Sequence, residues 1–130
     1  MATSLKRRFG DSGEERAVEY LIKNGYLIIE RNYRIKNLGE IDIVSKKGGQ
    51  LIFIEVKTRN VEHERNFPIG FSIDAKKRVN LRRICELYLI DKSYPHTTKW
   101  RVDAILIKVD REKDLYIFEY LENILWERYY

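Results

Sequence analysis

The stretch LIFIEVKTR, residues 51 to 59, begins as a buried strand and then places charged side chains where further apolar residues are expected. Side chains alternate between the two faces of a strand, so Glu55 and Lys57 share the face of Phe53. Both faces begin apolar, which is typical of a strand covered on both sides. Glu55 therefore emerges at the edge of a buried region, where a carboxylate is costly unless it is paired or binds a cation.

A second carboxylate, Asp42, stands between two isoleucines in the stretch before this strand. KGGQ, residues 47 to 50, is typical of a hairpin turn, which brings Asp42 towards Glu55. Two carboxylates within about 4 to 6 Å of each other repel unless one is protonated or both share a cation. Hard oxygen ligands favour Mg²⁺ or Mn²⁺ over zinc. The bare spacing D-x12-E-x-K also fits a structural ion pair, so that alternative stays open.

Patterns of apolar residues predict the order helix, three strands, helix and strand, with a fifth strand at the end. Ser12 and Glu15 have capping-box spacing at the start of the first helix, and Asp74 is the expected N-cap of the second. The expected ranges are 13–24 and 74–92 for the helices, and 26–35, 40–46, 51–59, 100–109 and 115–121 for the strands.

Connection lengths then predict how the strands pair. The first three strands are joined by turns too short for a crossover, which predicts an antiparallel meander. The second helix supplies a crossover to the fourth strand, and its apolar face is expected to hold Val79, Ile84, Leu87 and Tyr88. The predicted fold class is α/β, with a mixed sheet flanked by helices.

The length and net charge of the chain limit the classes of function that it can have. The 130 residues fit a single domain over 1–130, because domains of about 150 residues are common. The 25 Lys and Arg residues outnumber 20 acidic ones, for a net charge of +5, so an anionic partner such as nucleic acid is expected. The chain has no apolar stretch of the roughly 20 residues that would span a bilayer and no leader with an apolar segment. These features predict a cytoplasmic protein without a membrane partner.

The two ends of the chain differ from its centre. Residues 1–11 are expected to form a basic, mobile arm, and residues 121–130 an aromatic tail. The tail includes Trp126, Tyr129 and Tyr130, more large aromatic side chains than a free end normally exposes. A homodimer and packing of the tail on its own sheet are both open interpretations.

Four stretches resemble, in order and spacing, the YraN-type family of small uncharacterised bacterial proteins, a branch of the restriction-endonuclease-like superfamily close to archaeal Holliday junction resolvases. They are SGEERAVEYLIKNGYLIIERNYR (12–34), GEIDIVSKKGGQLIFIEVKTR (39–59), KKRVNLRRICELYL (76–89) and RVDAILI (101–107). The resemblance implies a restriction-endonuclease-like αβββαβ core. It also implies the PD-(D/E)xK signature of that superfamily, an aspartate and an E-x-K pair that hold Mg²⁺ for phosphodiester hydrolysis.

Transferred to this chain, the signature implies catalytic roles for Asp42, Glu55 and Lys57. Asp42, Glu55 and the Val56 carbonyl are the implied ligands of Mg²⁺ or Mn²⁺. Glu14 is the fourth catalytic candidate, since resolvases carry a further glutamate on their first helix, while Glu15 is assigned to the cap. The implied function is a metal-dependent endonuclease, with branched DNA as the expected substrate class. The alternative is a non-catalytic nucleic-acid-binding or assembly module that keeps the nuclease fold.

Basic residues of the second helix are the expected contacts to nucleic acid, with DNA favoured over RNA. Lys76, Lys77 and Arg82 lie in the densest basic run, and Arg59 extends the strand of Lys57. Such side chains bind backbone phosphates and position a duplex without reading its sequence. Lys77 best fits the lysine that the family carries on this helix. The alternative for the run is a solvated helix face.

Overall fold

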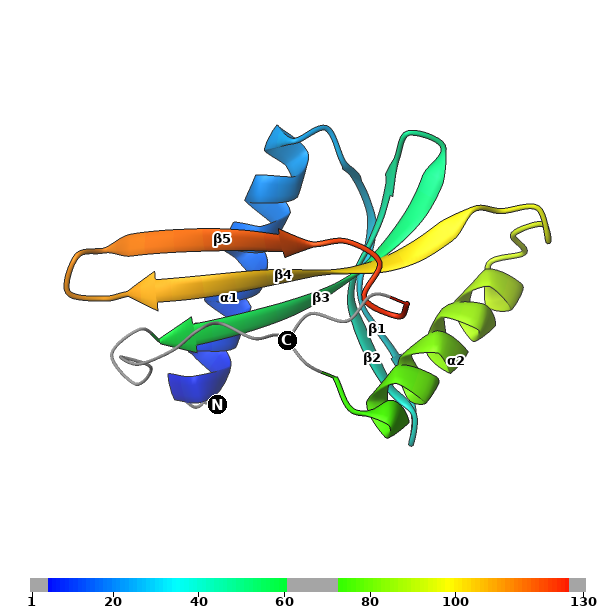
Figure 1. Cartoon of the computed structure of the whole chain (residues 1–130), viewed down its shortest axis with the longest axis horizontal. Coiled ribbons are helices and arrows are strands. Elements are labelled where there is room, and N and C mark those ends of the chain that lie inside the picture. Colours follow the sequence, from blue (N-terminus) through cyan, green and yellow to red (C-terminus); the bar gives the residue numbers. More distant parts are fainter. Residues whose placement is uncertain (1–4, 61–72, 127–130) are drawn as a thin grey trace.

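Five strands form one sheet, with helix α1 packed on one face and helix α2 on the other, in the computed structural model of the chain (Figure 1). The structure describes residues 5–60 and 73–126. The elements are α1 (Leu5–Lys23), β1 (Leu27–Ile35), β2 (Gly39–Lys47), β3 (Gln50–Asn60), α2 (Ala75–Asp91), β4 (Trp100–Asp110) and β5 (Leu115–Leu121). The predicted order and the α/β class are confirmed.

The sheet is mixed, as the connection lengths predicted. Its strand order is β1-β2-β3-β4-β5, and only the pair β3 and β4 is parallel. That parallel pair is joined through α2, because two parallel neighbours cannot be linked by a tight turn. The turn between β2 and β3 holds Gly48 and Gly49, both with positive φ (58° and 77°), as a two-residue hairpin turn requires.

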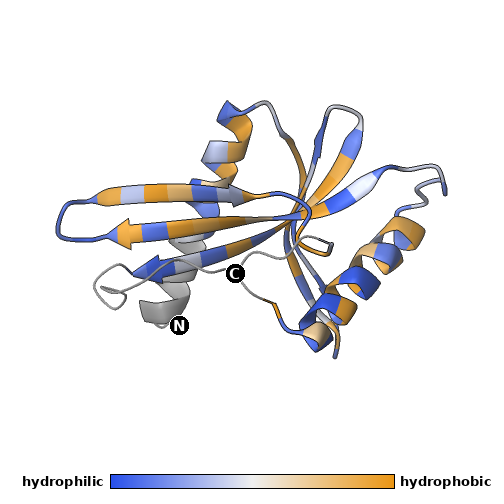
Figure 2. Ribbon diagram, viewed as in Figure 1, coloured by the Kyte–Doolittle hydropathy of each residue, from blue (hydrophilic) through white to orange (hydrophobic). Residues whose placement is uncertain are grey.

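Strand β3 contributes side chains to both halves of the core. Phe53 packs with Tyr88 on the α2 side, whereas Ile52 and Ile54 pack with Leu21 on the α1 side. Figure 2 shows the corresponding apolar colour through the middle of the strands. Each such side chain contributes about 1.5–3 kcal/mol relative to its exposed state. The alternation predicted for residues 51–58 is confirmed, and β3 is covered on both faces.

Helix α2 begins at the predicted N-cap but buries a different stripe. Asp74 accepts the backbone N–H of Lys77 at 2.7 Å. The expectation that Val79 is buried is wrong, because its exposed fraction is 66%. The buried residues are Leu81, Ile84, Cys85 and Tyr88. Their spacing follows the helical repeat, which carries Val79 round to the solvent side.

Helix α1 begins at Leu5, well before the predicted start near Gly13. Ser12 lies inside the helix, so the predicted capping box of Ser12 and Glu15 is wrong, and residues 5–11 of the expected arm are helical. Gly13 has a packing role instead. A Cβ atom at this position would lie 2.2 Å from Thr58 Oγ1, so glycine permits the close approach of α1 to β3.

The chain after β5 returns to its own fold. Ile124 and Leu125 are buried, and the Ile124 N–H donates to the Val102 carbonyl at 2.8 Å. Arg78 Nη1 donates to the Leu125 carbonyl at 2.9 Å, which ties α2 to this turn. The buried residues of the tail are thus aliphatic, whereas Trp126, its one aromatic residue within the described range, is 63% exposed. Tyr129 and Tyr130 lie outside the described residues, and a homodimer stays a prediction.

Asp103 on β4 is a fully buried carboxylate that joins three segments. Its oxygens accept bonds from Arg101 Nε at 3.0 Å, from the Asn123 N–H at 2.8 Å and from the Tyr120 hydroxyl. Burial, followed by the bond to Asp103, raises the pKa of Tyr120. This network holds β5 and the turn that follows it against β4.

No helix in the described part of the chain has both the length and the apolar character needed to cross a bilayer.

Candidate active site

Counted from the hairpin turn, the ladder of paired residues between β2 and β3 ends at Ile43, one residue short of Asp42. Paired positions run from Lys47 and Gln50 to Ile43 and Ile54. Past this point β2 continues beside β1, while β3 continues beside β4. The Asp42 carboxylate accepts the Val56 N–H at 2.8 Å. A side chain thus takes a backbone donor of β3 at the place where the two strands part.

Strand β1 is also irregular opposite Asp42. Asn32 has a φ of +56°, in the left-handed region that asparagine tolerates better than most residues. The pairs that flank it join β1 to Ile41 and Ile43, which pack on opposite faces of the sheet. Residues two apart in a regular strand share a face. The ribbon of β1 and β2 therefore turns over at Asp42 and leaves its carboxylate at an open end.

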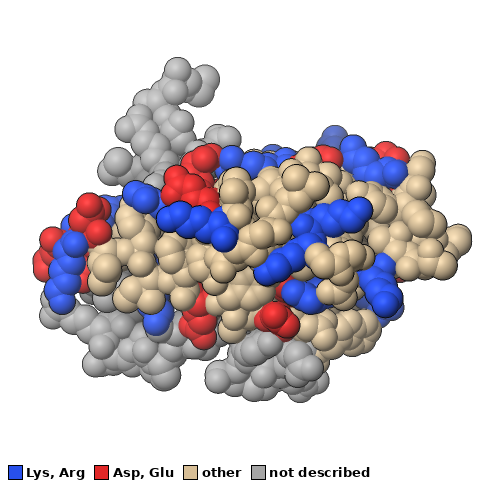
Figure 3. Space-filling view, turned by 90° about the horizontal axis from the view of Figure 1, so that it is seen from above, with Lys and Arg blue, Asp and Glu red and all other residues tan. Residues whose placement is uncertain are grey.

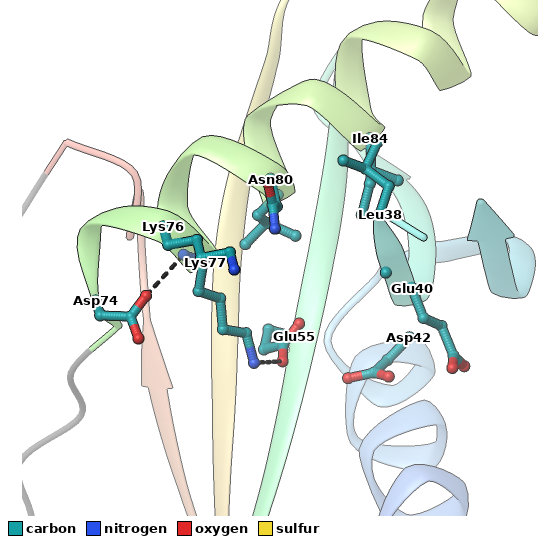
Figure 4. A pocket seen from close by; sticks show the side chains of 11 residues that line it. Leu38, Glu40, Asp42, Glu55, Asp74, Lys76, Lys77, Asn80 and Ile84 are labelled. Carbon is teal, nitrogen blue, oxygen red and sulfur yellow. Dashed lines mark hydrogen bonds and ion pairs between the residues drawn. The ribbon is translucent and has the colours of Figure 1, made fainter. Parts of the chain in front are cut away.

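Glu55 lies beside this point and is paired with two lysines. Its side chain is only 8% exposed, and its Oε1 atom lies 2.9 Å from Lys77 Nζ and 3.5 Å from Lys57 Nζ. Figure 4 shows Lys77 reaching from α2 to Glu55 on β3. Glu55 and Lys57 thus share one face, as the sequence predicted. Lys77 binds Glu55, although it was expected only as a phosphate contact.

Asp42, Glu55 and Lys77 line a cleft of about 390 Å³ between α2 and the ends of β2 and β3, here called the acidic cleft (Figure 4). Its polar lining consists of Glu40, Asp42, Glu55, Asp74, Lys76, Lys77 and Asn80. Leu38, Leu81 and Ile84 form its apolar wall. The N-terminal turn of α2 therefore faces the two strand ends that carry Asp42 and Glu55.

Acidic neighbours surround Asp42 from both faces of the sheet. Burial raises its pKa to about 7, and the charges of Glu55, Glu14 and Glu40 add to this, while the bond from Val56 opposes it. Glu14 thus joins the group from α1, as the resemblance implied. Glu40 was missed because its position beside Asp42 depends on the twist of β2, although the GEID motif contains it.

Asn32 links two of these acids. With its amide nitrogen facing the carboxylates, that nitrogen lies 3.1 Å from Glu14 Oε1 and 2.7 Å from Glu40 Oε1. Asn32 was also missed by the sequence interpretation. The available signal was an asparagine within an otherwise β-prone stretch, since asparagine is disfavoured in regular strands.

The raised pKa of Asp42 predicts a pH-dependent stability. The folded protein holds the Asp42 proton more tightly than the unfolded chain, so the free energy of unfolding falls as pH rises from about 4 to about 7. Asp42→Asn should remove this loss, so that its free energy of unfolding at pH 8 exceeds that of wild type by up to about 4 kcal/mol. Urea unfolding at several pH values measures it. Asp114→Asn in an exposed turn is the control, and parallel curves for wild type and Asp42→Asn would contradict the prediction.

The two lysines differ in how readily they lose a proton. Burial and the neighbouring Lys77 lower the pKa of Lys57, and Glu55 only partly opposes them. Burial also acts to lower the pKa of Lys77, but Lys57, Glu55 and Asp42 outweigh it and raise that pKa. Lys57 is therefore the better proton acceptor of the pair, and Lys77 is the more persistent cation.

The other predicted contacts are divided between the cleft and the surface. Lys76 lines the acidic cleft, and Arg59 is exposed farther along β3. Arg82 turns away from the cleft, with its guanidinium 5.1 Å from the Trp126 ring centroid and its Nε 3.7 Å from Glu86. Figure 3 shows Lys and Arg interspersed with uncharged residues on the upper face of the molecule. Among the side chains that the structure describes, the basic charge on that face forms no single continuous patch.

The donor set of the cleft fits a hard divalent ion. In residues 5–60 and 73–126, no three His, Cys, Asp or Glu side chains gather closely enough to hold a metal by themselves. Mg²⁺ usually keeps several waters and needs only one or two carboxylates from the protein. Asp42 and Glu55 with the Val56 carbonyl meet that need, and a cation would balance the neighbouring negative charges that, together with burial as the larger cause, raise the pKa of Asp42.

The fold and the cleft define a class of small α/β proteins. Members of this class have a mixed sheet and, at the point where two strands separate, a site made of carboxylates and lysines. The chain belongs to the uncharacterised protein family UPF0102, whose model matches residues 13–107. UPF0102 is the YraN family, so the resemblance drawn from the sequence motifs is confirmed.

Similar proteins match along most of the chain. A UPF0102 protein from Dictyoglomus thermophilum is 38% identical over 120 residues, which cover 90% of this chain and 96% of the relative. A UPF0102 protein from Caldicellulosiruptor saccharolyticus is 36% identical over 121 residues, covering 91% and 97%. Among solved structures, Pyrococcus furiosus SfsA in complex with Ca²⁺ matches with a TM-score of 0.39 and 14% identity, covering 90% of this chain and 63% of that chain.

Proposed function

We propose that the protein is a Mg²⁺-dependent nuclease that hydrolyses phosphodiester bonds in nucleic acid, with branched DNA as its substrate class. One observation carries the proposal. Glu55, which is buried, and Asp42, which is partly buried, lie at an open end of the sheet in one cleft with Lys77, and Lys57 pairs with Glu55 beside it. Clustered like charges would destabilise a cleft that had only a structural role, because burying them costs free energy.

Asp42, Glu55 and the Val56 carbonyl would hold the metal. Bound there, Mg²⁺ would polarise a phosphate oxygen and lower the pKa of an attacking water. Lys57 is placed beside Glu55 on the same face of β3, and the lowered pKa of its ammonium suits a group that exchanges protons. In its charged form Lys57 would stabilise the negative charge that develops on the phosphate.

Residues at the rim of the cleft would position the substrate. Lys76 lies on the first turn of α2 and lines the acidic cleft, while Arg59 is exposed beyond Lys57 on β3. Both side chains carry a positive charge near the proposed point of hydrolysis. Contacts of this kind hold phosphates without reading bases, which suits recognition of nucleic-acid shape over sequence.

A specific observation favours the alternative, a non-catalytic nucleic-acid-binding module. Glu55 is already neutralised by the ammonium groups of Lys57 and Lys77. A carboxylate with two such partners is satisfied without a metal, and the fold then keeps an ion-pair network in place of a catalytic centre. Under this alternative, nucleic acid would bind equally well with and without divalent ions.

Cleavage of a substrate panel separates the two functions. Purified protein is incubated with branched, flapped, duplex and single-stranded DNA and with the matching RNA, in Mg²⁺, Mn²⁺ or EDTA. We expect branched DNA to be cut in Mg²⁺ or Mn²⁺ and no substrate to be cut in EDTA. Binding of the panel in EDTA without cleavage under any condition would reject the nuclease and support the module.

A further inference from the structure

Lys57 and Lys77 both contact the same atom of Glu55. Lys77 Nζ lies 2.9 Å from Oε1 and Lys57 Nζ lies 3.5 Å from it. Lys57 follows two residues later on the same strand, whereas Lys77 reaches across the cleft from α2. The shorter and charge-assisted bond is the one that crosses the cleft, so it closes the space between α2 and β3.

A metal ion on Oε1 of Glu55 would compete with that bond for the same oxygen. A magnesium ion binds a carboxylate oxygen at about 2.0–2.1 Å. An ammonium hydrogen-bonded to the same oxygen would then lie close to a doubly charged ion, and the two cations would repel each other. Glu55 is 8% exposed and has little freedom to turn a second oxygen elsewhere. The bond from Lys77 and a metal on Glu55 are therefore alternatives.

Lys77 is able to leave without disturbing the helix. Its backbone N–H is fixed by the N-cap Asp74 at 2.7 Å, so the first turn of α2 stays in place. Its side chain is 41% exposed, and the flexible four-carbon stem allows the ammonium to turn towards solvent. Lys57 has no comparable freedom, because its side chain is more buried, at 31% exposed, and leaves β3 directly beside Glu55.

We propose that Lys77 is an internal cation that closes the metal site of the free protein, and that a divalent ion binds only by displacing the Lys77 ammonium from Glu55. This inference rests on the metal site of the proposed function. Lys77 thereby lowers the metal affinity of the free protein, and its ammonium leaves Glu55 only when a metal ion takes its place. It is a positioning residue that regulates when Glu55 becomes available.

Calorimetric titration of the full chain with Mn²⁺ tests the proposal. Lys77→Met should bind Mn²⁺ roughly 10- to 100-fold more tightly than wild type, the range that corresponds to one charge-assisted hydrogen bond. Lys77→Arg keeps a cation of similar reach and should stay within about threefold of wild type. Lys46→Met on the exposed end of β2 removes the same charge far from Glu55 and should change little.

The outcomes separate the two proposals. If Mn²⁺ binds wild type and Lys77→Met equally, or binds the variant more weakly, the role of Lys77 is overturned while the metal site stands. If neither protein binds Mn²⁺, the metal site fails and the role of Lys77 fails with it. A second readout is direct, because the Lys77 Cε resonances of wild type should shift on addition of Mg²⁺ with those of Lys46 unchanged. Lys77 resonances that do not move in a protein that binds Mg²⁺ would also overturn the proposal.

Discussion

Glu55→Gln should reduce metal-dependent cleavage by at least about 100-fold and remove Mn²⁺ binding. The amide keeps the size of the side chain but loses the charge that a divalent ion needs, and losses of this size are typical when one electrostatic group of an active site is removed. The variant also leaves Lys57 and Lys77 without the carboxylate that now separates them. Single-turnover cleavage of the best substrate and calorimetry with Mn²⁺ measure the two effects.

A second variant distinguishes loss of chemistry from loss of fold. Glu55→Gln is expected to lower stability, because two ammonium groups are left facing each other. Asp42→Asn is expected to remove cleavage as well, but to be at least as stable as wild type at pH 8, since it relieves the repulsion around Asp42. Glu86→Gln on the exposed side of α2 is the matched control for the amide exchange. Wild-type cleavage rates in both site variants would reject the mechanism.

Asp103→Ala should lower the free energy of unfolding by about 3–5 kcal/mol, the usual cost of removing one partner of a buried charged pair. The change leaves the Arg101 guanidinium, the Tyr120 hydroxyl and the Asn123 N–H without their shared acceptor. It also loosens the turn that carries Ile124 and Leu125 into the core. Urea unfolding at neutral pH, followed by circular dichroism, gives the difference.

The control for this prediction lies on the same strand. Asp110→Ala at the end of β4 removes a carboxylate whose bond to the Lys113 N–H is exposed, and it should change stability by no more than about 0.5 kcal/mol. The stability of Asp103→Asn should lie between those of Asp103→Ala and Asp110→Ala, because an amide oxygen still accepts a hydrogen bond. Equal stabilities of Asp103→Ala and Asp110→Ala would contradict a structural role for the network.

The order of the elements along the chain and the antiparallel pairing of the first three strands were predictable from the sequence because they depend on local signals. Residues 51–58 alternate between two apolar faces, and Gly48 with Gly49 marks a tight turn, so the hairpin follows directly. The start of α1 was not predictable in the same way. Gly13 was interpreted as the start of a helix, but its lack of a side chain serves the contact with Thr58, which is far away in the sequence. Long-range packing of this kind leaves no local pattern.

The candidate site was predictable only as far as the hairpin reaches. Asp42, Glu55 and Lys57 follow from strand alternation and from the turn that joins two strands. Glu40 and Asn32 join them because β1 and β2 turn over at Asp42, a backbone irregularity that alternation cannot indicate. The bond from Lys77 to Glu55 depends on how α2 docks across the sheet, so the sequence could place Lys77 on the helix but not its partner.

Strand β3 has one partner that is near in the chain and one that is distant. Two glycines separate it from β2, whereas its parallel pairing joins Leu51 to Trp100. Because short loops close at a lower entropic cost than long ones, we expect the β2 and β3 hairpin to form early in folding and the pairing with β4 to form late. Asp42 and Glu55 therefore meet before α2 delivers Lys77. At that stage the open end of the hairpin holds Glu40, Asp42 and Glu55 with only Lys57 beside Glu55, so the docking of α2 would be drawn by these carboxylates as well as by the apolar core.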